Sequence, residues 1–163
     1  MTRIVVLLSC ALLGACSHTA MEAARQDNRL IEQIARASMA EIAAGNLAVT
    51  KARAPELRQL GERIAEDHGN LLKAASGLAA SRGTSIPATP GAAHQPALRR
   101  LESLADASFD RAFRDHMLKQ HQHTLQLLQQ AASQAGDPQL RAHAQSAIPH
   151  IERQLATARR LAF

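Results

Sequence analysis

The sequence has very few aromatic residues. They make up 2% of the 163 residues, with no tryptophan, no tyrosine and three phenylalanines. β-Sandwiches and β-barrels depend on aromatic and β-branched side chains, so this composition argues against them. Alanine, the best helix former, is instead the most frequent residue. A chain of this length holds one domain with a sizeable core and is too short for two. We therefore expect a single all-α domain.

The N-terminal segment lacks an apolar run long enough to cross a membrane. Arg3 is the only charged residue among the first 21, and an apolar run over residues 4–13 leads into the sequence Leu-Gly-Ala-Cys, which ends at Cys16. A transmembrane helix needs about 20 apolar residues, so the shorter run is typical of a signal peptide. Leu-Gly-Ala-Cys resembles the bacterial lipobox, in which the cysteine becomes the lipid-bearing N-terminus. We predict a signal peptide over residues 1–15, a lipid on Cys16 and a tether over 16–24. The alternative is ordinary secretory cleavage that leaves Cys16 free.

The predicted export and lipidation limit which partners the protein can meet and which chemistry its cysteines can perform. Ser17, which follows Cys16, resembles the outer-membrane sorting signal of Gram-negative lipoproteins. We expect a lipid anchor in the outer membrane and a domain that faces the periplasm, where its partner is an envelope protein or ligand. The net charge of +5 suggests nucleic acid as a partner, but that location argues against it. With Cys10 removed and Cys16 lipidated, we expect no disulfide, no cysteine-bound zinc and no catalytic thiol.

Apolar residues recur at spacings of three and four along the rest of the chain, which predicts amphipathic helices. Proline and glycine residues divide them. We predict a four-helix bundle over residues 25–163, with helices over about 22–53, 55–82, 96–135 and 138–161. A long loop, residues 83–95, joins the second helix to the third. It is long enough either to cross the whole bundle, as in ferritin-like folds, or to join neighbouring ends.

Polar side chains interrupt the apolar faces of these helices. Glu41, His68 and His121 are each in step with the apolar residues of their helix, and Glu152 and Gln154 flank the apolar line of the last helix. Glu41 and His68 lie equally far, 13 residues, from the first turn, and His121 and Glu152 lie at similar distances from the last turn. Helices joined by a tight turn are antiparallel, so residues equally far from that turn lie at one level. We therefore expect these side chains to share one layer in the middle of the bundle.

Two interpretations of this layer are open. Imidazole and carboxylate groups from facing helices can hold a single iron, manganese or zinc ion. A buried polar network that fixes helix register is the other interpretation. A di-iron centre is not expected, because it needs two Glu-x-x-His motifs and the sequence contains none. The candidate ligands are Glu41, His68, His121 and Glu152, and the candidates for the surrounding shell are Asp67, Asp110 and Gln154.

Four short segments, spread in order over most of the chain, carry a resemblance to a known family. They are Ala40-Glu41-Ile42 with Gly45-Asn46-Leu47-Ala48, then Ala65-Glu66-Asp67-His68, then Phe109-Asp110-Arg111-Ala112-Phe113 followed by His121, and finally Ile148-Pro149 before Ile151. Together they resemble a bacterial family known as domain of unknown function 4142. The resemblance implies an exported protein, often a lipoprotein, with a ferritin-like bundle, and it implies no settled activity. The family pattern tends to place a histidine five residues after that proline, where this chain has Gln154.

Catalytic signatures are missing from the sequence, which contains no Gly-rich phosphate loop and no Gly-x-Ser-x-Gly motif. We therefore expect a non-enzymatic envelope protein that acts as a binding or structural module. The alternative is a metal-binding ferritin-like protein with a Glu/His site in the middle of the bundle and a redox role.

Overall fold

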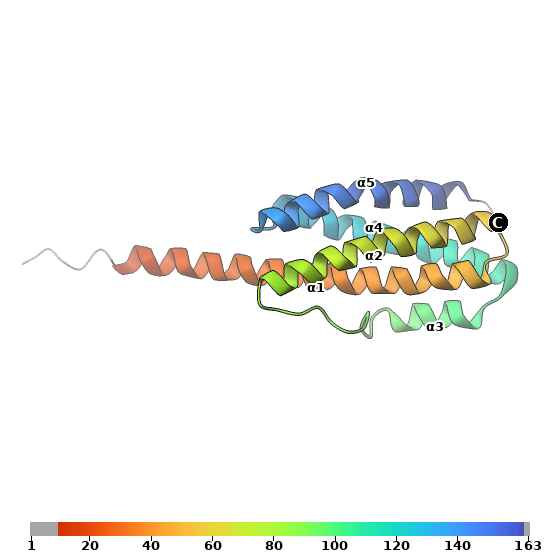
Figure 1. Cartoon of the computed structure of the whole chain (residues 1–163), viewed down its shortest axis with the longest axis horizontal. Helices are drawn as coiled ribbons and strands as arrows, with labels where there is room; N and C mark the ends of the chain where they lie inside the picture. The colour runs from red at the N-terminus through yellow and green to blue at the C-terminus, as the bar shows by residue number, and fades with distance from the viewer. Residues whose placement is uncertain (1–9, 162–163) are drawn as a thin grey trace, which may run out of the picture.

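The computed structural model describes residues 10–161, which form five α-helices joined by turns and loops (Figure 1). These residues contain no β-strand. The helices are α1 (Cys10–Lys51), α2 (Pro55–Ser81), α3 (Gln95–Ser103), α4 (Asp106–Gln134) and α5 (Pro138–Arg160). The predicted all-α class is therefore confirmed.

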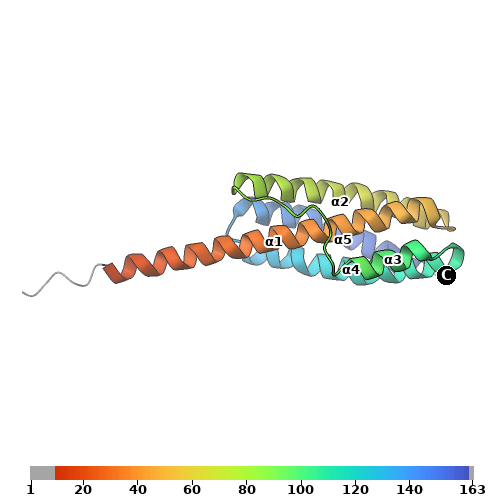
Figure 2. The same ribbon diagram turned by 90° about the horizontal axis from the view of Figure 1, so that it is seen from below.

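The four long helices lie side by side, and the short α3 packs on the outside against α1 and α4 (Figure 1 and Figure 2). α1 and α2 form one antiparallel hairpin, and α4 and α5 form the other. Residues 82–94 contain no helix. Together with α3 they run back along the length of the bundle, so that α4 begins at the end where α2 begins. Of the two routes open from the sequence, the chain takes the lengthwise crossing.

α1 begins earlier than the sequence predicted. It starts at Cys10 rather than near residue 22, so the predicted tether over residues 16–24 is helical, and α1 extends well beyond the other helices (Figure 1). Residues 1–9 and the side chain of Cys16 lie outside the described part of the structure, so cleavage and lipidation stay predictions. None of the described helices combines the length and the hydropathy that a membrane crossing requires.

The single helix predicted over residues 96–135 was wrong, because the structure has two helices there. Leu104 and Ala105 are extended, and Asp106 has a φ of 49°, so the chain reverses direction between α3 and α4. An unbroken helix of that length would run far past α2, which has 27 residues. The reversal instead folds α3 back so that its leucines are buried against the bundle. The apolar spacing continues through both helices, which is why the sequence pattern hides the break.

A polar layer divides the buried core into two apolar clusters. One cluster lies toward the turn between α4 and α5 and includes Leu30, Ile34, Leu71, Leu128 and Ile151. The other lies toward the turn between α1 and α2 and includes Leu57, Leu60, Ile64, Phe109, Phe113 and Met117. Glu41, His68 and His121 are buried between them. The candidate site is therefore enclosed by apolar packing along the bundle axis.

Two glycines let α1 and α2 approach closely beside this layer. A Cβ atom at Gly45 would lie 2.7 Å from the carbonyl oxygen of Gly61, and a Cβ at Gly61 would lie 2.6 Å from the carbonyl oxygen of Gly45. Both obstacles are backbone atoms, which cannot rotate aside. The close approach lies about one helical turn from Glu41 and two from His68, so it sets how near these side chains come.

Replacement of Gly61 by alanine should lower the free energy of unfolding by about 2 kcal/mol, because the added methyl group forces the two helices apart. Gly77→Ala in the same helix is the matched control. A Cβ at Gly77 meets nothing within 4 Å, so alanine should raise stability by up to about 1 kcal/mol through helix propensity. Urea unfolding followed by far-UV circular dichroism measures both, and an equal loss of stability in both variants would contradict the close approach.

Candidate metal centre

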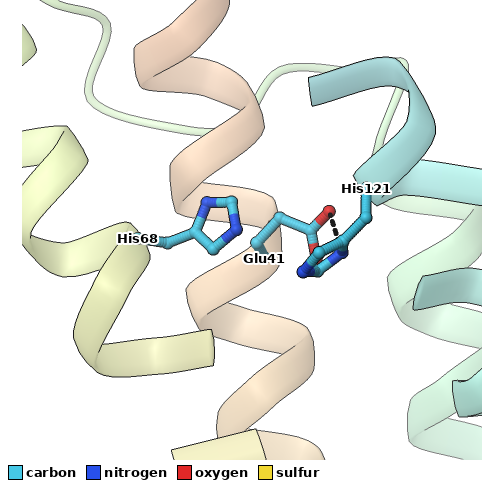
Figure 3. Close-up of side chains that lie close together, drawn as sticks. All are labelled: Glu41, His68 and His121. Carbon is cyan, nitrogen blue, oxygen red and sulfur yellow. Dashed lines mark ion pairs between the residues drawn. The ribbon is translucent and has the colours of Figure 1, made fainter. Parts of the chain in front are cut away.

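Three ionisable side chains meet in the polar layer, each from a different helix. Glu41 comes from α1, His68 from α2 and His121 from α4, and they lie together between the helices (Figure 3). Each is at most 1% exposed. One carboxylate oxygen and one nitrogen from each ring lie within 4.8 Å of one another. The structure thus brings together the three residues that their distances from the turns placed at one level.

Most polar atoms of this group have no hydrogen-bond partner. These atoms are both carboxylate oxygens of Glu41, both ring nitrogens of His68 and Nδ1 of His121. The distance from His121 Nδ1 to Glu41 Oε1 is 3.6 Å, which is too long for a good hydrogen bond (Figure 3). The rings of His68 and His121 meet edge to face, with their centroids 5.5 Å apart. Because about nine in ten buried polar groups in proteins are paired, this arrangement fits a site that binds a ligand between these atoms.

A chain of hydrogen bonds orients His121. Gln154 of α5 donates from Nε2 to Asp67 Oδ2 at 2.6 Å, and its Oε1 lies 2.6 Å from His121 Nε2. Since an amide oxygen can only accept, Nε2 of His121 must carry the hydrogen. Neutral His121 therefore has its lone pair on Nδ1, the nitrogen nearer to Glu41. Metal-binding histidines are usually held in this way, with the second ring nitrogen donating a hydrogen bond.

Burial controls the charge of all three groups. It raises the pKa of Glu41 well above the usual range. It also lowers the pKa of His68 to about 3, and the nearby His121 adds to that effect. Burial lowers the pKa of His121 too, although the hydrogen bond with Gln154 opposes the shift. Both imidazoles are therefore neutral at pH 7 with lone pairs available to a cation, and a bound cation would favour the ionised form of Glu41.

The group can offer two imidazole nitrogens and one carboxylate oxygen to a single ion. Imidazole suits zinc, copper and iron, and carboxylate oxygen also suits manganese. Within the described residues, no further His, Cys, Asp or Glu joins this group. The arrangement therefore fits one ion held by three protein ligands, and a four-coordinate ion would take its fourth ligand from outside the group.

Glu152, predicted as a fourth ligand, does not reach the centre. It is exposed to solvent on α5 and lies outside the group. Residues two apart project in nearly opposite directions from a helix, and the burial of Ile151 and Leu155 turns Gln154 inward instead. Gln154 contacts both His121 and Asp67. Gln154 and Asp67 therefore lie next to the centre, where the sequence analysis placed them.

Asp110 was also misplaced by the sequence prediction, which put it beside the centre. It lies 11 residues before His121, which is about 16 Å along a helix. Its buried carboxylate instead accepts hydrogen bonds from the backbone N–H groups of Arg53 and Ala54, at 2.9 and 3.0 Å. Asp110 therefore fastens the turn between α1 and α2 to α4. At the opposite end, Asp27 holds the turn between α4 and α5 in the same way.

Asp110→Ala should lower the free energy of unfolding by about 3 kcal/mol, because two backbone N–H groups lose a charged acceptor that is itself buried. Metal stoichiometry should not change. The matched control is Asp115→Ala in the same helix, whose side chain is 71% exposed and which should change stability by no more than about 0.5 kcal/mol. Loss of bound metal without loss of stability would restore Asp110 to the metal centre.

Two histidines outside the group interact with the centre or with the residues around it. His150 is exposed, but its Nδ1 lies 3.1 Å from Asp67 Oδ1, so it joins the chain that leads to His121. His116 is half-buried, and burial followed by the charges of His121, His94 and Lys119 lowers its pKa to about 4. His150 and Gln154 are four residues apart and so lie on the same face of α5, which is the feature of the sequence that could have placed His150 near this chain.

Comparison with known proteins gives two similarities. A family model described as "Domain of unknown function (DUF4142)" matches residues 14–161. Among solved structures, this chain is similar to "CopM in the Cu(II)-bound form", with 20% sequence identity and a TM-score of 0.71, over 82% of this chain and 93% of that chain. At this identity the similarity shows a shared fold alone. No curated protein matches the chain.

Proposed function

The chain belongs to the DUF4142 family, and we propose that this member binds a single transition-metal ion between Glu41, His68 and His121. One observation carries the proposal: five buried polar atoms of these three residues lie close together without hydrogen-bond partners. A cation held between them satisfies the carboxylate and both imidazoles at once. The hydrogen bond that Gln154 accepts from His121 supports the same conclusion, because it leaves the lone pair of His121 available to the ion.

Copper is the ion to test first. Sites with nitrogen and oxygen ligands bind Cu(II) more tightly than manganese, iron or zinc. The protein that is similar in fold is described in a Cu(II)-bound form, which supports the same choice. Iron, manganese and zinc suit these donors as well and are the ions to test next.

We place this binding function in the cell envelope. The lipobox-like sequence that ends at Cys16 supports a lipoprotein anchored in the outer membrane with its bundle in the periplasm. α1 continues beyond the other helices toward Cys16, which would hold the bundle away from the membrane (Figure 1). The four long helices and the lengthwise crossing support a ferritin-like fold. A single ion with three ligands favours a non-enzymatic binding role over the chemistry of a two-metal oxidase.

A module that docks proteins through an apolar surface has less support. Among the residues whose burial is described, Met21 is the one large hydrophobic side chain that is exposed. Contiguous apolar patches are the usual mark of such surfaces.

Elemental analysis tests the proposal directly. The protein is purified without added metal, stripped with a chelator and titrated with Cu(II). We expect one equivalent of tightly bound copper in the wild-type protein and none in His68→Ala. The proposal is wrong if the stripped protein retains no copper, zinc, iron or manganese after reconstitution.

A layer that serves only to fix helix packing is the competing explanation, and a variant separates the two. In the metal-free protein, Glu41→Met should raise the free energy of unfolding by about 2 kcal/mol, because it removes a buried carboxyl group that has no partner. A structural network broken at one member would instead lose about 3 kcal/mol or more. Glu62→Met, at an exposed position of α2, is the control, and urea unfolding in the presence of chelator is the measurement.

A further inference from the structure

We propose that a metal ion reaches the buried centre through a surface site formed by Asp67 of α2 and His150 of α5. This inference rests on the proposed function and adds the route by which the centre is loaded. The observations that carry it are the exposure of this pair, its hydrogen-bonded connection to His121, and the packing that closes the centre along the bundle axis and between α1 and α2.

The surface site combines a carboxylate and an imidazole within reach of one ion. His150 Nδ1 lies 3.1 Å from Asp67 Oδ1, and the two side chains are 48% and 27% exposed. A hollow of about 290 Å³ opens beside them between α2 and α5, and Asn70, His143 and Ser146 also line it. Every polar side chain of this hollow can bind a cation through oxygen or nitrogen, and it contains no lysine or arginine.

Gln154 connects this site to the centre. Asp67 uses Oδ1 toward His150 and Oδ2 toward Gln154, whose other end contacts His121. Gln154 is 4% exposed, so its side chain closes the gap between the surface pair and the buried imidazole. Rotation of this one flexible side chain would open the path, because both of its strongest hydrogen bonds are made by the terminal amide.

Packing closes the centre along the bundle axis and between α1 and α2. Apolar clusters close it along the bundle axis in both directions. The backbones of Gly45 and Gly61 nearly touch on the side between α1 and α2. On the other side of the surface pair, a second hollow of about 400 Å³ reaches Gln154, and Arg63 and Arg153 line it together with the acidic Glu66 and Asp67. We assign the approach to the surface pair to the first hollow, because its lining contains no cationic lysine or arginine.

Loading through this site follows from the chemistry of the pair. A divalent ion takes the place of the hydrogen between His150 Nδ1 and Asp67 Oδ1, and the neutral ring carries its one hydrogen on Nε2, so that Nδ1 offers its lone pair to the ion. The ion then passes Gln154 as the amide swings aside, and it exchanges its surface ligands for Glu41, His68 and His121. Because the surface site lies on the path and not at its end, it alters the rates of loading and release and not the final affinity.

Stopped-flow absorption of Cu(II) binding tests the route in the full chain. His150→Ala should slow loading about tenfold, within the range by which oriented charges accelerate association. Release to a chelator should slow by the same factor, so that the dissociation constant stays unchanged. His123→Ala, at an exposed position of α4, is the matched control and should load at the wild-type rate. Equal loading rates in His150→Ala and wild type would overturn the surface site while leaving the buried centre intact.

Paramagnetic broadening provides a measurement that does not need the buried centre. In Glu41→Gln, substoichiometric Cu(II) should broaden the nuclear magnetic resonance signals of the His150 ring and of residues beside Asp67. This broadening should disappear when His150→Ala is added. Broadening confined to other histidines would overturn the surface site, whereas broadening at His150 with no retained copper in the wild-type protein would contradict the buried centre and with it the loading role.

Discussion

Glu41→Gln should weaken Cu(II) binding by at least about 100-fold, which exceeds the 10- to 100-fold effect of typical changes in the shell around a metal. Glutamine has the same shape, but it lacks the negative charge that compensates a buried cation. Because both carboxylate oxygens of Glu41 are buried without hydrogen-bond partners, the substitution breaks no hydrogen bond. The loss should therefore appear in binding while the fold stays intact.

The chain offers a matched control for this variant in Glu152→Gln. It makes the same chemical change on α5, at a position that is exposed and outside the group, and we expect wild-type affinity. Competition with a chromophoric chelator measures both dissociation constants. Gln154→Leu should fall between them, at about 10- to 100-fold weaker binding, because His121 loses the acceptor that orients it. Equal affinities for Glu41→Gln and Glu152→Gln would remove Glu41 from the ligand set.

The metal-free protein should lose about 5 kcal/mol of stability between pH 6.5 and about 3 through His68 alone. Unfolded His68 takes up a proton near pH 6.5, whereas burial and the neighbouring His121 keep the folded side chain neutral until pH about 3. Over that interval the unfolded state binds more protons, so acid favours unfolding. Glu41 acts in the opposite sense, since its raised pKa stabilises the folded state below pH 4.5 and that contribution is lost as the pH rises.

The contribution of His68 is isolated by comparison with His68→Gln, which cannot titrate. Urea unfolding followed by circular dichroism at half-unit steps from pH 7 to pH 4 should give a steeper loss of stability in the wild-type protein than in the variant. His123→Gln, at an exposed position, should follow the wild-type curve. Parallel curves for the wild type and His68→Gln would show that His68 is not buried in its neutral form.

The register of the site was predictable from the sequence, because it depends on a tight turn. Ala54 and Pro55 fix where α1 ends and α2 begins, so the level at which Glu41 and His68 meet follows from their distance to that point. His121 could be placed in the same way. Asp110 shares a helix face with His121, but its spacing of 11 residues already places it about 16 Å away along the axis, so the sequence was sufficient to exclude it from the centre.

The outer parts of the site depend on how separate hairpins pack. The contact of Asp67 with Gln154 and His150 joins α2 to α5, which belong to different hairpins and lie side by side only once the chain has crossed the bundle. The spacing of residues within α2 or within α5 does not show that these two helices are neighbours. The sequence also did not show whether Glu152 or Gln154 points toward the centre. Both are polar and both flank the apolar line of α5, and the packing of that apolar face decides which of them is turned inward.

Electron paramagnetic resonance of the protein with one equivalent of Cu(II) tests the central claim most directly. Nitrogen hyperfine structure reports how many imidazoles coordinate the ion. We expect the coupling of two nitrogens in the wild-type protein and in Glu152→Gln, and the loss of this two-nitrogen pattern in His68→Gln. The same nitrogen pattern in the wild type and in His68→Gln would show that the ion binds elsewhere.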